Sequence, residues 1–168
     1  MKIETLEDFY TQELRDLYDA ENQILKVLPK MASSATSPEL RRLFGDHIDE
    51  TKVHVQRLDE IFESLKISPK GKHCKAMEGI LSEAEEVFLD SMPDNVKDAA
   101  LIAAAQRVEH YEMAGYGCVR TYARLLGQDD AAEQLDETLQ DEGDADKALT
   151  ALAEATVNDD ANVELAVG

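Results

Sequence analysis

Two glutamates, Glu109 and Glu112, interrupt the apolar face of a long helical pattern. Residues that step by three and four along the chain lie on one side of a helix. This face is formed by Ile102, Ala105, Glu109, Glu112, Tyr116, Val119, Ala123 and Leu126. An unpaired carboxylate is costly to bury, because it loses the stabilisation that water gives to its charge. The two glutamates therefore predict a positively charged group in the core at their level.

Acids interrupt the apolar faces of the three other long helical patterns as well. They are Glu21 in the first pattern, Glu50 with His54 in the second, and Glu142 with Asp146 in the last. A single acid of this kind is more often a solvated carboxylate at the edge of a core, and Asp and Glu make up 36 of the 168 residues. Their coincidence near the midpoints of four helices favours a shared site instead, because converging carboxylates need cations to stay charged in a dry core.

Two divalent metal ions are the simplest source of that positive charge. Oxygen-rich ligation with little imidazole suits iron or manganese better than zinc or copper. Dinuclear sites inside helical bundles are built from inward-facing glutamates and histidines. We therefore expect two ions, with iron favoured over manganese. The predicted ligands are Glu21, Glu50, His54, Glu109, Glu112, Glu142 and Asp146.

The four histidines fit such a site to different degrees. His54 lies on an apolar face one turn after Glu50, so it is the best candidate ligand, with a buried structural histidine as the alternative. His47 is expected to support the site or to pack against it. His110 points away from the apolar face of its helix, and His73 lies in a loop.

Asp146 occupies a position where a second histidine is expected, one turn after Glu142. Two readings remain open for it: weaker ligation of one metal ion, or a role only as a hydrogen-bond partner. Three tyrosines are candidates to hydrogen bond a ligand carboxylate, with simple packing as the alternative. They are Tyr18, Tyr111 and Tyr116.

Four long helices and a shorter one are predicted to position these residues. The long helices are expected from after Thr5 to about Met31, from Pro38 to Leu65, from about Asn95 to Leu126, and from about Asp129 to Ala155. The segment 66–93 is long enough to return along the bundle and contains a short amphipathic helix, which makes the second and third long helices parallel. The predicted fold is all-α, a ferritin-like four-helix bundle with an additional short crossover helix. Residues 1–155 form the bundle, and residues 156–168 form an acidic tail that is expected to be disordered.

Composition narrows the range of partners and compartments. The formal net charge of −19 argues against nucleic acid and anionic membrane surfaces, which both require basic patches. No apolar run has the length of a membrane span, and the first residues lack the apolar region of a signal peptide. The two cysteines, Cys74 and Cys118, show no metal-type spacing and are expected to be reduced. These features predict a cytoplasmic protein.

The chain from about Ile3 to Ala155 resembles the ferritin-like stress proteins of the YciE/YciF type. The motifs that carry the resemblance are Tyr18-Asp-Ala-Glu-Asn-Gln23, Asp49-Glu-Thr51 with Arg57-Leu58, Cys74-Lys-Ala-Met-Glu-Gly79, and Asp98 to Gln106 followed by Val108-Glu-His-Tyr-Glu112. The resemblance implies a four-helix bundle with a crossover helix, a dimer, and a dinuclear metal site like that of rubrerythrins. The rubrerythrin ligand positions correspond to Glu21, Glu50 with His54, Glu109 with Glu112, and Glu142.

Two departures bear on the activity that this resemblance implies. Asp146 replaces the histidine of the fourth helix, and the chain has no Cys-x-x-Cys pair for a rubredoxin-type iron. Electrons would therefore come from outside the chain. The first hypothesis is a homodimeric iron or manganese protein that acts on peroxide or oxygen, a di-metal oxidoreductase. The second is a non-catalytic, stress-induced helical dimer that binds partners or metal passively, which the replacement by Asp146 favours. A storage role like that of ferritin is a third hypothesis.

Overall fold

The structure is a computed structural model that describes residues 2–163. This range consists of helices and connecting loops and contains no strand. The helices are α1 (Leu6–Ser34), α2 (Pro38–Leu65), α3 (Lys75–Leu89), α4 (Asp94–Leu125), α5 (Asp129–Leu152), the π-helical segment η1 (Ala153–Val157) and α6 (Asn158–Ala161).

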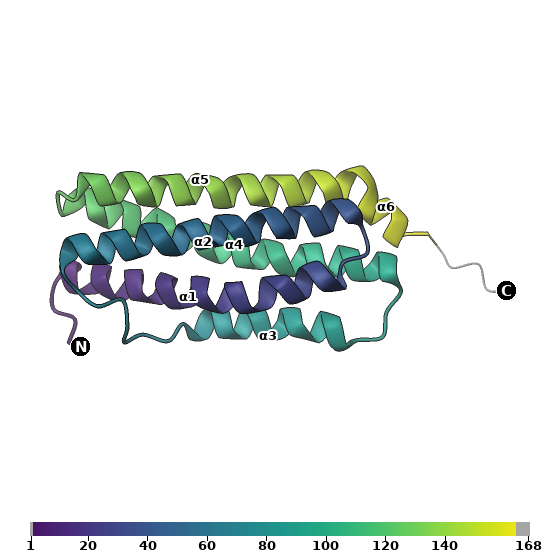
Figure 1. Cartoon of the computed structure of the whole chain (residues 1–168), viewed down its shortest axis with the longest axis horizontal. Coiled ribbons are helices and arrows are strands. Elements are labelled where there is room, and N and C mark those ends of the chain that lie inside the picture. The colour runs from purple at the N-terminus through teal and green to yellow at the C-terminus, as the bar shows by residue number, and fades with distance from the viewer. Residues whose placement is uncertain (1, 164–168) are drawn as a thin grey trace.

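The four long helices lie side by side along the length of the molecule (Figure 1). α1 contacts α2 and α4, and α5 contacts the same two helices, so the four form a closed bundle. α3 runs back along the outside against α1 and α4, and α4 then runs in the same direction as α2 (Figure 1). The predicted all-α bundle with a crossover helix is confirmed.

Helix starts follow the capping residues that the sequence contains. The Thr5 hydroxyl accepts from the Asp8 amide at 3.1 Å, and the Asp8 carboxylate accepts from the Thr5 amide at 3.0 Å. This reciprocal pair satisfies two amides that the first turn of α1 leaves without helical partners. In α2, Ser37 caps the helix and Pro38 occupies its first position, where the missing N–H costs nothing.

α1 extends three residues beyond the predicted end at Met31. Pro29 lies inside the helix rather than closing it, and the helix stops at Ser34. The Ala35 amide still donates to the Met31 carbonyl, at 3.0 Å, and the Met31 side chain is buried. Burial of this last turn in the core therefore offsets the hydrogen bond that proline cannot donate.

Asp98, near the start of α4, binds the loop that joins α1 to α2. Its carboxylate accepts from the Thr36 amide at 2.7 Å, from the Thr36 hydroxyl at 2.6 Å and from the Ser37 amide at 2.7 Å. Asp98 is buried, so each of these hydrogen bonds satisfies a polar group removed from water. The contact fixes α4 along its axis relative to α1 and α2.

The apolar core is divided into two clusters, one toward each end of the bundle. One cluster includes Ile24, Met31, Phe44, Leu101, Val108 and Leu149, and the other includes Leu14, Leu17, Leu58, Phe62, Tyr116 and Leu135. Along every long helix, the predicted ligands lie between the residues of these two clusters. Glu21, for example, lies between Leu17 and Ile24. The predicted ligands therefore form one polar layer between the two apolar clusters of the core.

Gly115 of α4 allows a close approach to α1 beside this layer. A Cβ atom at position 115 would lie 2.7 Å from Leu17 Cδ2, which is too short for two carbon atoms. Leu17 is one turn before Glu21, and Gly115 is one turn after Glu112. The missing side chain thus lets the two glutamates face each other across a narrow interface.

The ordered chain continues past residue 155, where the sequence predicted the bundle to end. η1 and α6 extend it to Ala161, and Val157 is buried against the first apolar cluster. The prediction of disorder from residue 156 is therefore wrong for residues 156–161, because one apolar side chain anchors this segment. Residues 164–168 of the predicted tail lie outside the described residues. Between residues 2 and 163, no helix combines the length and apolarity that a membrane span requires.

Candidate metal centre

The polar layer contains two groups of side chains whose ligand atoms lie within 4.8 Å of one another. One group comprises Glu21, His54 and Glu142, and the other comprises His47, Glu109, Glu112 and Glu142. All six residues are buried, and they come from α1, α2, α4 and α5. Glu142 belongs to both groups, so the two form one continuous centre, with a His54 half and a His47 half.

The His54 half is closed to solvent. His54 Nδ1 lies 2.9 Å from Glu142 Oε1 and 3.6 Å from Glu21 Oε1. The Tyr116 hydroxyl donates to the same Glu21 oxygen. The four residues are fully buried, so every charge in this half must be balanced by a neighbour within the layer.

The His47 half holds the two glutamates of α4. His47 Nε2 lies 3.4 Å from Glu109 Oε1 and 3.8 Å from Glu142 Oε2. The Glu112 carboxylate completes the group. Three carboxylates surrounding one imidazole make this half richer in oxygen than the His54 half.

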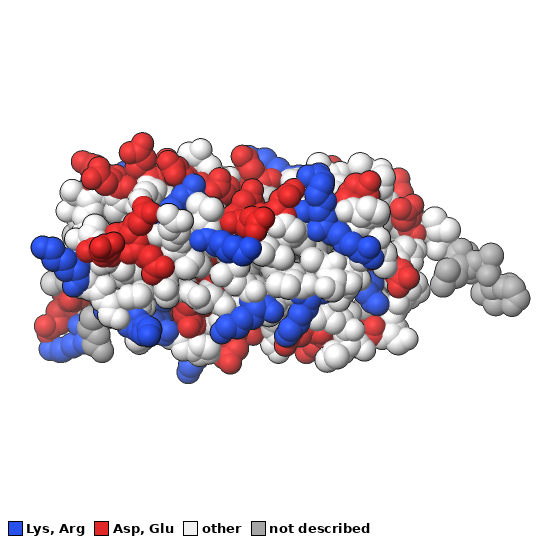
Figure 2. Space-filling view, viewed as in Figure 1, with Lys and Arg blue, Asp and Glu red and all other residues white. Residues whose placement is uncertain are grey.

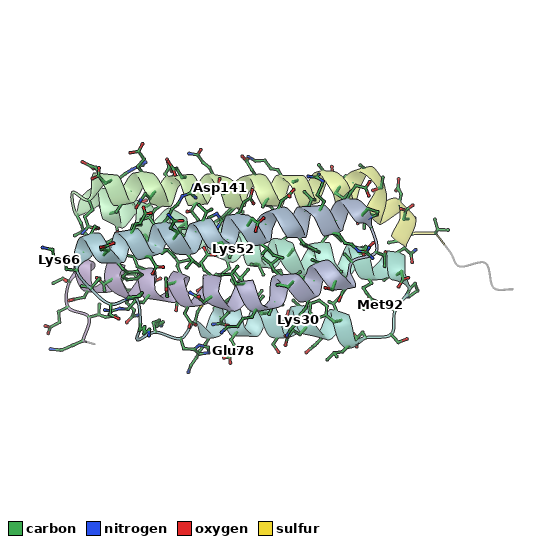
Figure 3. All side chains as sticks on the ribbon, in the orientation of Figure 1. Lys30, Lys52, Lys66, Glu78, Met92 and Asp141 are labelled. Atoms are coloured by element: carbon green, nitrogen blue, oxygen red, sulfur yellow. The ribbon has the colours of Figure 1, made fainter. Side chains whose placement is uncertain are left out.

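Each histidine has a second carboxylate at the nitrogen that faces away from the centre. Asp141 Oδ2 lies 3.4 Å from His54 Nε2 and accepts from Arg57 Nη1 at 2.7 Å. Glu50 Oε2 lies 3.4 Å from His47 Nδ1. Figure 3 labels Asp141 on α5, near the middle of the bundle. A carboxylate at the outer nitrogen orients a metal-binding imidazole and fixes which nitrogen is free to bind.

Burial and neighbouring charges together shift the pKa values of the side chains in the layer. Burial raises the pKa of Glu21 to about 7, although the charge of His54 opposes this. Burial and the charge of Glu142 raise the pKa values of Glu109 and Glu112 well above the ordinary range. Burial disfavours the charged forms of His54 and Glu142, but their close pairing outweighs it: the pKa of His54 rises to about 9 and that of Glu142 falls. Glu109 and Glu112 therefore retain protons, and Glu21 retains its proton below about pH 7, until another cation replaces them.

Several buried atoms of the layer lack a hydrogen-bond partner among the described residues. They are both oxygens of Glu112 and of Glu142, Oε2 of Glu21 and of Glu109, both nitrogens of His47, and Nδ1 of His54. Buried polar atoms are almost always satisfied in folded proteins, so a cluster of exceptions requires an explanation. Glutamate oxygens and imidazole nitrogens are the donor set of dinuclear iron and manganese sites. The residues of the layer therefore fit the binding of a metal ion.

Five of the seven predicted ligands meet in these two groups: Glu21, His54, Glu109, Glu112 and Glu142. The other two lie outside both groups. Glu50 is about half exposed, with 48% of its side-chain surface accessible. Asp146 lies beside α4, where Gln106 donates to it at 3.1 Å and His110 Nε2 approaches it at 3.2 Å.

His47 belongs to the centre, although the sequence suggested only a supporting role. It precedes His54 by seven residues, which is close to two helical turns, so both imidazoles point to the same side of α2. This spacing is the signal that identifies it. Among the three candidate tyrosines, Tyr116 hydrogen bonds a glutamate of the centre, whereas Tyr111 donates to Asp16 at 2.5 Å and Tyr18 packs edge-on against Phe62.

Known proteins are similar to this chain in both sequence and fold. Protein YciF of Escherichia coli (strain K12) is 44% identical over 161 residues, which cover 94% of this chain and 96% of that protein. The crystal structure of the E. coli stress protein YciF superimposes with a TM-score of 0.89 at 43% identity and covers 93% of this chain and 99% of that one. YcfI from Rhodopseudomonas palustris superimposes with a TM-score of 0.86 at 41% identity and covers 89% and 95% of the two chains.

The matches extend over the whole bundle rather than over an isolated motif. The family described as "Domain of unknown function (DUF892)" matches residues 5–162, which include every residue of the polar layer. The resemblance to YciF-type stress proteins is therefore confirmed, and the chain belongs to the DUF892 family.

Proposed function

We propose that this protein is a ferritin-like stress-response protein that holds two iron or manganese ions in the polar layer and acts on peroxide or oxygen. The two positions are assigned to Glu21, His54 and Glu142, and to His47, Glu109, Glu112 and Glu142. One observation carries the proposal: buried carboxylates from three helices converge with two imidazoles, and nine of their atoms have no hydrogen-bond partner among the described residues. The stress-response role is carried over from the description of E. coli YciF as a stress protein.

The bound ions would supply Lewis acidity and, between them, two electrons for the reduction of a peroxide or of oxygen. The protein supplies the environment. The two apolar clusters shield the layer from bulk water toward each end of the bundle, which strengthens the electrostatic interactions within it. The Tyr116 hydroxyl holds its proton toward Glu21 Oε1, so Glu21 Oε2 is left free. Asp141, which Arg57 anchors, orients the His54 imidazole from outside, and the half-exposed Glu50 lies beside the outer nitrogen of His47.

The test is elemental analysis of protein purified without chelator, before and after incubation with Fe(II) or Mn(II). We expect about two ions per chain, as in other dinuclear bundle proteins. Loss of hydrogen peroxide is then followed with loaded and metal-free protein, with an external reductant present. Saturable loss that requires the loaded centre supports an oxidoreductase. A chain that remains metal-free after incubation contradicts the metal centre itself.

A second function, non-catalytic binding of partners or metal, is favoured by the raised pKa values of Glu21, Glu109 and Glu112. Burial is their main cause, and it allows the layer to exist with neutral carboxyls and no ion. Full metal loading without peroxide turnover would support this function.

Gel filtration tests the proposed homodimer and at the same time the storage role, because storage requires a large hollow assembly.

A further inference from the structure

A pocket between α2 and α5 leads from the surface to the His47 half of the centre. Its volume is about 230 Å³. Its walls are formed by Leu43, Phe44, Asp46, His47, Glu50, Glu109, Asp141, Asp144, Ala145, Ala148 and Leu149. A water molecule occupies about 30 Å³ in the liquid, so the pocket can hold a cation together with its hydration shell.

The floor of this pocket consists of two ligand candidates. His47 and Glu109 are buried, with side chains only 7% and 3% exposed, and both line the pocket. Both ring nitrogens of His47 and the Oε2 atom of Glu109 lack a hydrogen-bond partner in the part of the chain that the structure describes. The pocket therefore ends on unsatisfied atoms of the centre rather than on an apolar wall.

The mouth of the pocket is acidic. Asp46, Glu50 and Asp144 are exposed there, and no lysine or arginine is among the lining residues. Figure 2 shows acidic side chains gathered over α2 and α5 near the middle of the molecule. Asp46 pairs with Arg42 at 2.9 Å and Asp144 with Lys147 at 2.8 Å, both on their own helices. Within residues 2–163, the ion-pair partner of Glu50 is His47, which leaves its negative charge uncompensated by lysine or arginine.

One other cavity that touches the layer is much smaller. A second cavity touches His47 and Glu109 from the side of α1 and α3, but its volume is about 10 Å³, and its other walls are apolar. A space of that size is at or below the minimum that can hold a single water molecule, so it cannot admit a hydrated cation. The residues of the His54 half are fully buried.

We propose that the pocket between α2 and α5 is the route by which divalent cations reach the centre, with Glu50 as the carboxylate that receives them at its mouth. This inference rests on the proposed metal centre and adds a path to it. The acidic mouth raises the local concentration of divalent cations, as charged clefts do for ligands of opposite sign. Glu50 reaches from the exposed mouth to His47 Nδ1, and His47 Nε2 faces the buried glutamates, so the two side chains connect solvent with the centre.

The experiment measures the rate and the extent of Co(II) uptake by metal-free full-length protein, followed by stopped-flow absorbance and elemental analysis. Glu50→Gln is expected to slow uptake on the order of fivefold at low ionic strength and to leave the final number of ions unchanged. Ala145→Leu, which narrows the pocket without changing any charge, is expected to slow uptake at every ionic strength.

Glu63→Gln is the matched control, because it removes the same charge from an exposed position on the same helix. Position 63 is thirteen residues beyond position 50, roughly 20 Å along the helix, so the charge of Glu63 acts on a cation at the mouth of the pocket far more weakly than the adjacent charge of Glu50, even at low ionic strength. Its uptake rate is expected to match that of the unmodified protein.

The outcomes distinguish a failure of the proposed route from a failure of the proposed metal centre. Unchanged uptake rates in both pocket variants, with about two ions bound at the end, would overturn the route and leave the metal centre intact. Loss of an ion in Glu50→Gln would overturn the role proposed for Glu50 and identify it as a ligand, as the sequence suggested. Absence of bound cobalt in the unmodified protein would overturn both proposals.

Discussion

The two halves of the centre are built alike but enclosed differently. Each has an imidazole that points one nitrogen at shared glutamates and the other at an outer carboxylate. Around His54, the outer carboxylate is Asp141, which Arg57 anchors, and every inner residue is fully buried. Around His47, the outer carboxylate is the half-exposed Glu50, and a pocket reaches the imidazole.

This difference indicates that one arrangement of residues can serve two purposes. A rigid, enclosed half favours tight retention of an ion, since its ligands are held in place by hydrogen bonds and packing. A half that borders a pocket favours exchange of ions and access for small molecules. We therefore expect the two halves to differ in kinetics more than in ligand chemistry.

The largest effect is expected from removal of the feature that the halves share. Glu142→Gln takes one carboxylate from both groups, so metal content should fall from about two ions per chain to near zero. Elemental analysis after Fe(II) incubation measures this. Glu133→Gln, an exposed position on the same helix, should keep full loading. Retention of both ions in Glu142→Gln would show that Glu142 does not join the halves.

Removal of one imidazole at a time should distinguish the halves. His54→Ala and His47→Ala are each expected to lose about one of two ions, because each histidine belongs to one group. The ion left in His47→Ala occupies the enclosed half and should exchange more slowly with free metal than the ion left in His54→Ala. Isotope exchange followed by mass spectrometry measures both rates. Equal rates would remove the kinetic distinction between the halves.

The metal-free protein should lose stability as the pH rises from about 5 to 9. Burial raises the pKa of Glu21 from 4.5 to about 7, so the stability from its bound proton is complete below pH 4.5 and is lost towards pH 7. Despite its burial, pairing with Glu142 raises the pKa of His54 from 6.5 to about 9, so that contribution is lost as the pH rises through 9. A fall in Tm on the order of 15 °C over this range is expected.

Calorimetry of metal-free and metal-loaded protein checks this pH dependence. The Glu21→Gln variant should lose the part of the slope below pH 7, because glutamine resembles the protonated acid. Loaded protein should show a smaller slope, since bound ions take the place of the protons. A metal-free Tm that rises with pH would contradict the ionisation described for the layer.

A smaller effect is expected from the outer carboxylate of the enclosed half. Asp141→Asn leaves His54 in place but weakens its orientation, so metal affinity should fall by about tenfold. The uptake rate should stay near that of the unmodified protein, unlike that of Glu50→Gln. Competition with a chelator gives the affinity. An equal loss of affinity in both variants would mean that Glu50 and Asp141 act alike.

The smallest effect is expected at Asp146, which the sequence placed among the ligands. Asp146→Asn should keep about two ions per chain, because this side chain lies outside both groups and pairs with Gln106 and His110. Elemental analysis measures the number of ions per chain, and the loss of an ion in this variant would identify Asp146 as a ligand.

The fold could be predicted from the sequence because each of its determinants is local. Capping at Thr5 and Ser37 and apolar steps of three and four define the helices, and the length of segment 66–93 implies the crossover. The continuation of helical structure to Ala161 could not be predicted in this way. It depends on burial of Val157 against residues distant in sequence.

The centre was predictable where an acid lies in the middle of an apolar face, as do Glu21, Glu109 and Glu142. The sequence could not show which of His47 and Glu50 is buried on α2, because both border the same face and differ by less than one turn. Which of them points inward depends on the rotation of α2 relative to α5, and this is set by packing of the whole bundle. Asp146 and Ala145 present the same ambiguity on α5.

The hydrogen bonds of Asp98 also help to fix the positions of the α4 glutamates in the centre. Asp98 precedes Glu109 by eleven residues, close to three full turns, so the two side chains lie on the same side of α4. Sliding α4 by a single residue would displace its glutamates by about 1.5 Å along the helix axis, a large error for metal coordination. The loop between α1 and α2 therefore sets the axial register of the glutamates that α4 contributes to the polar layer.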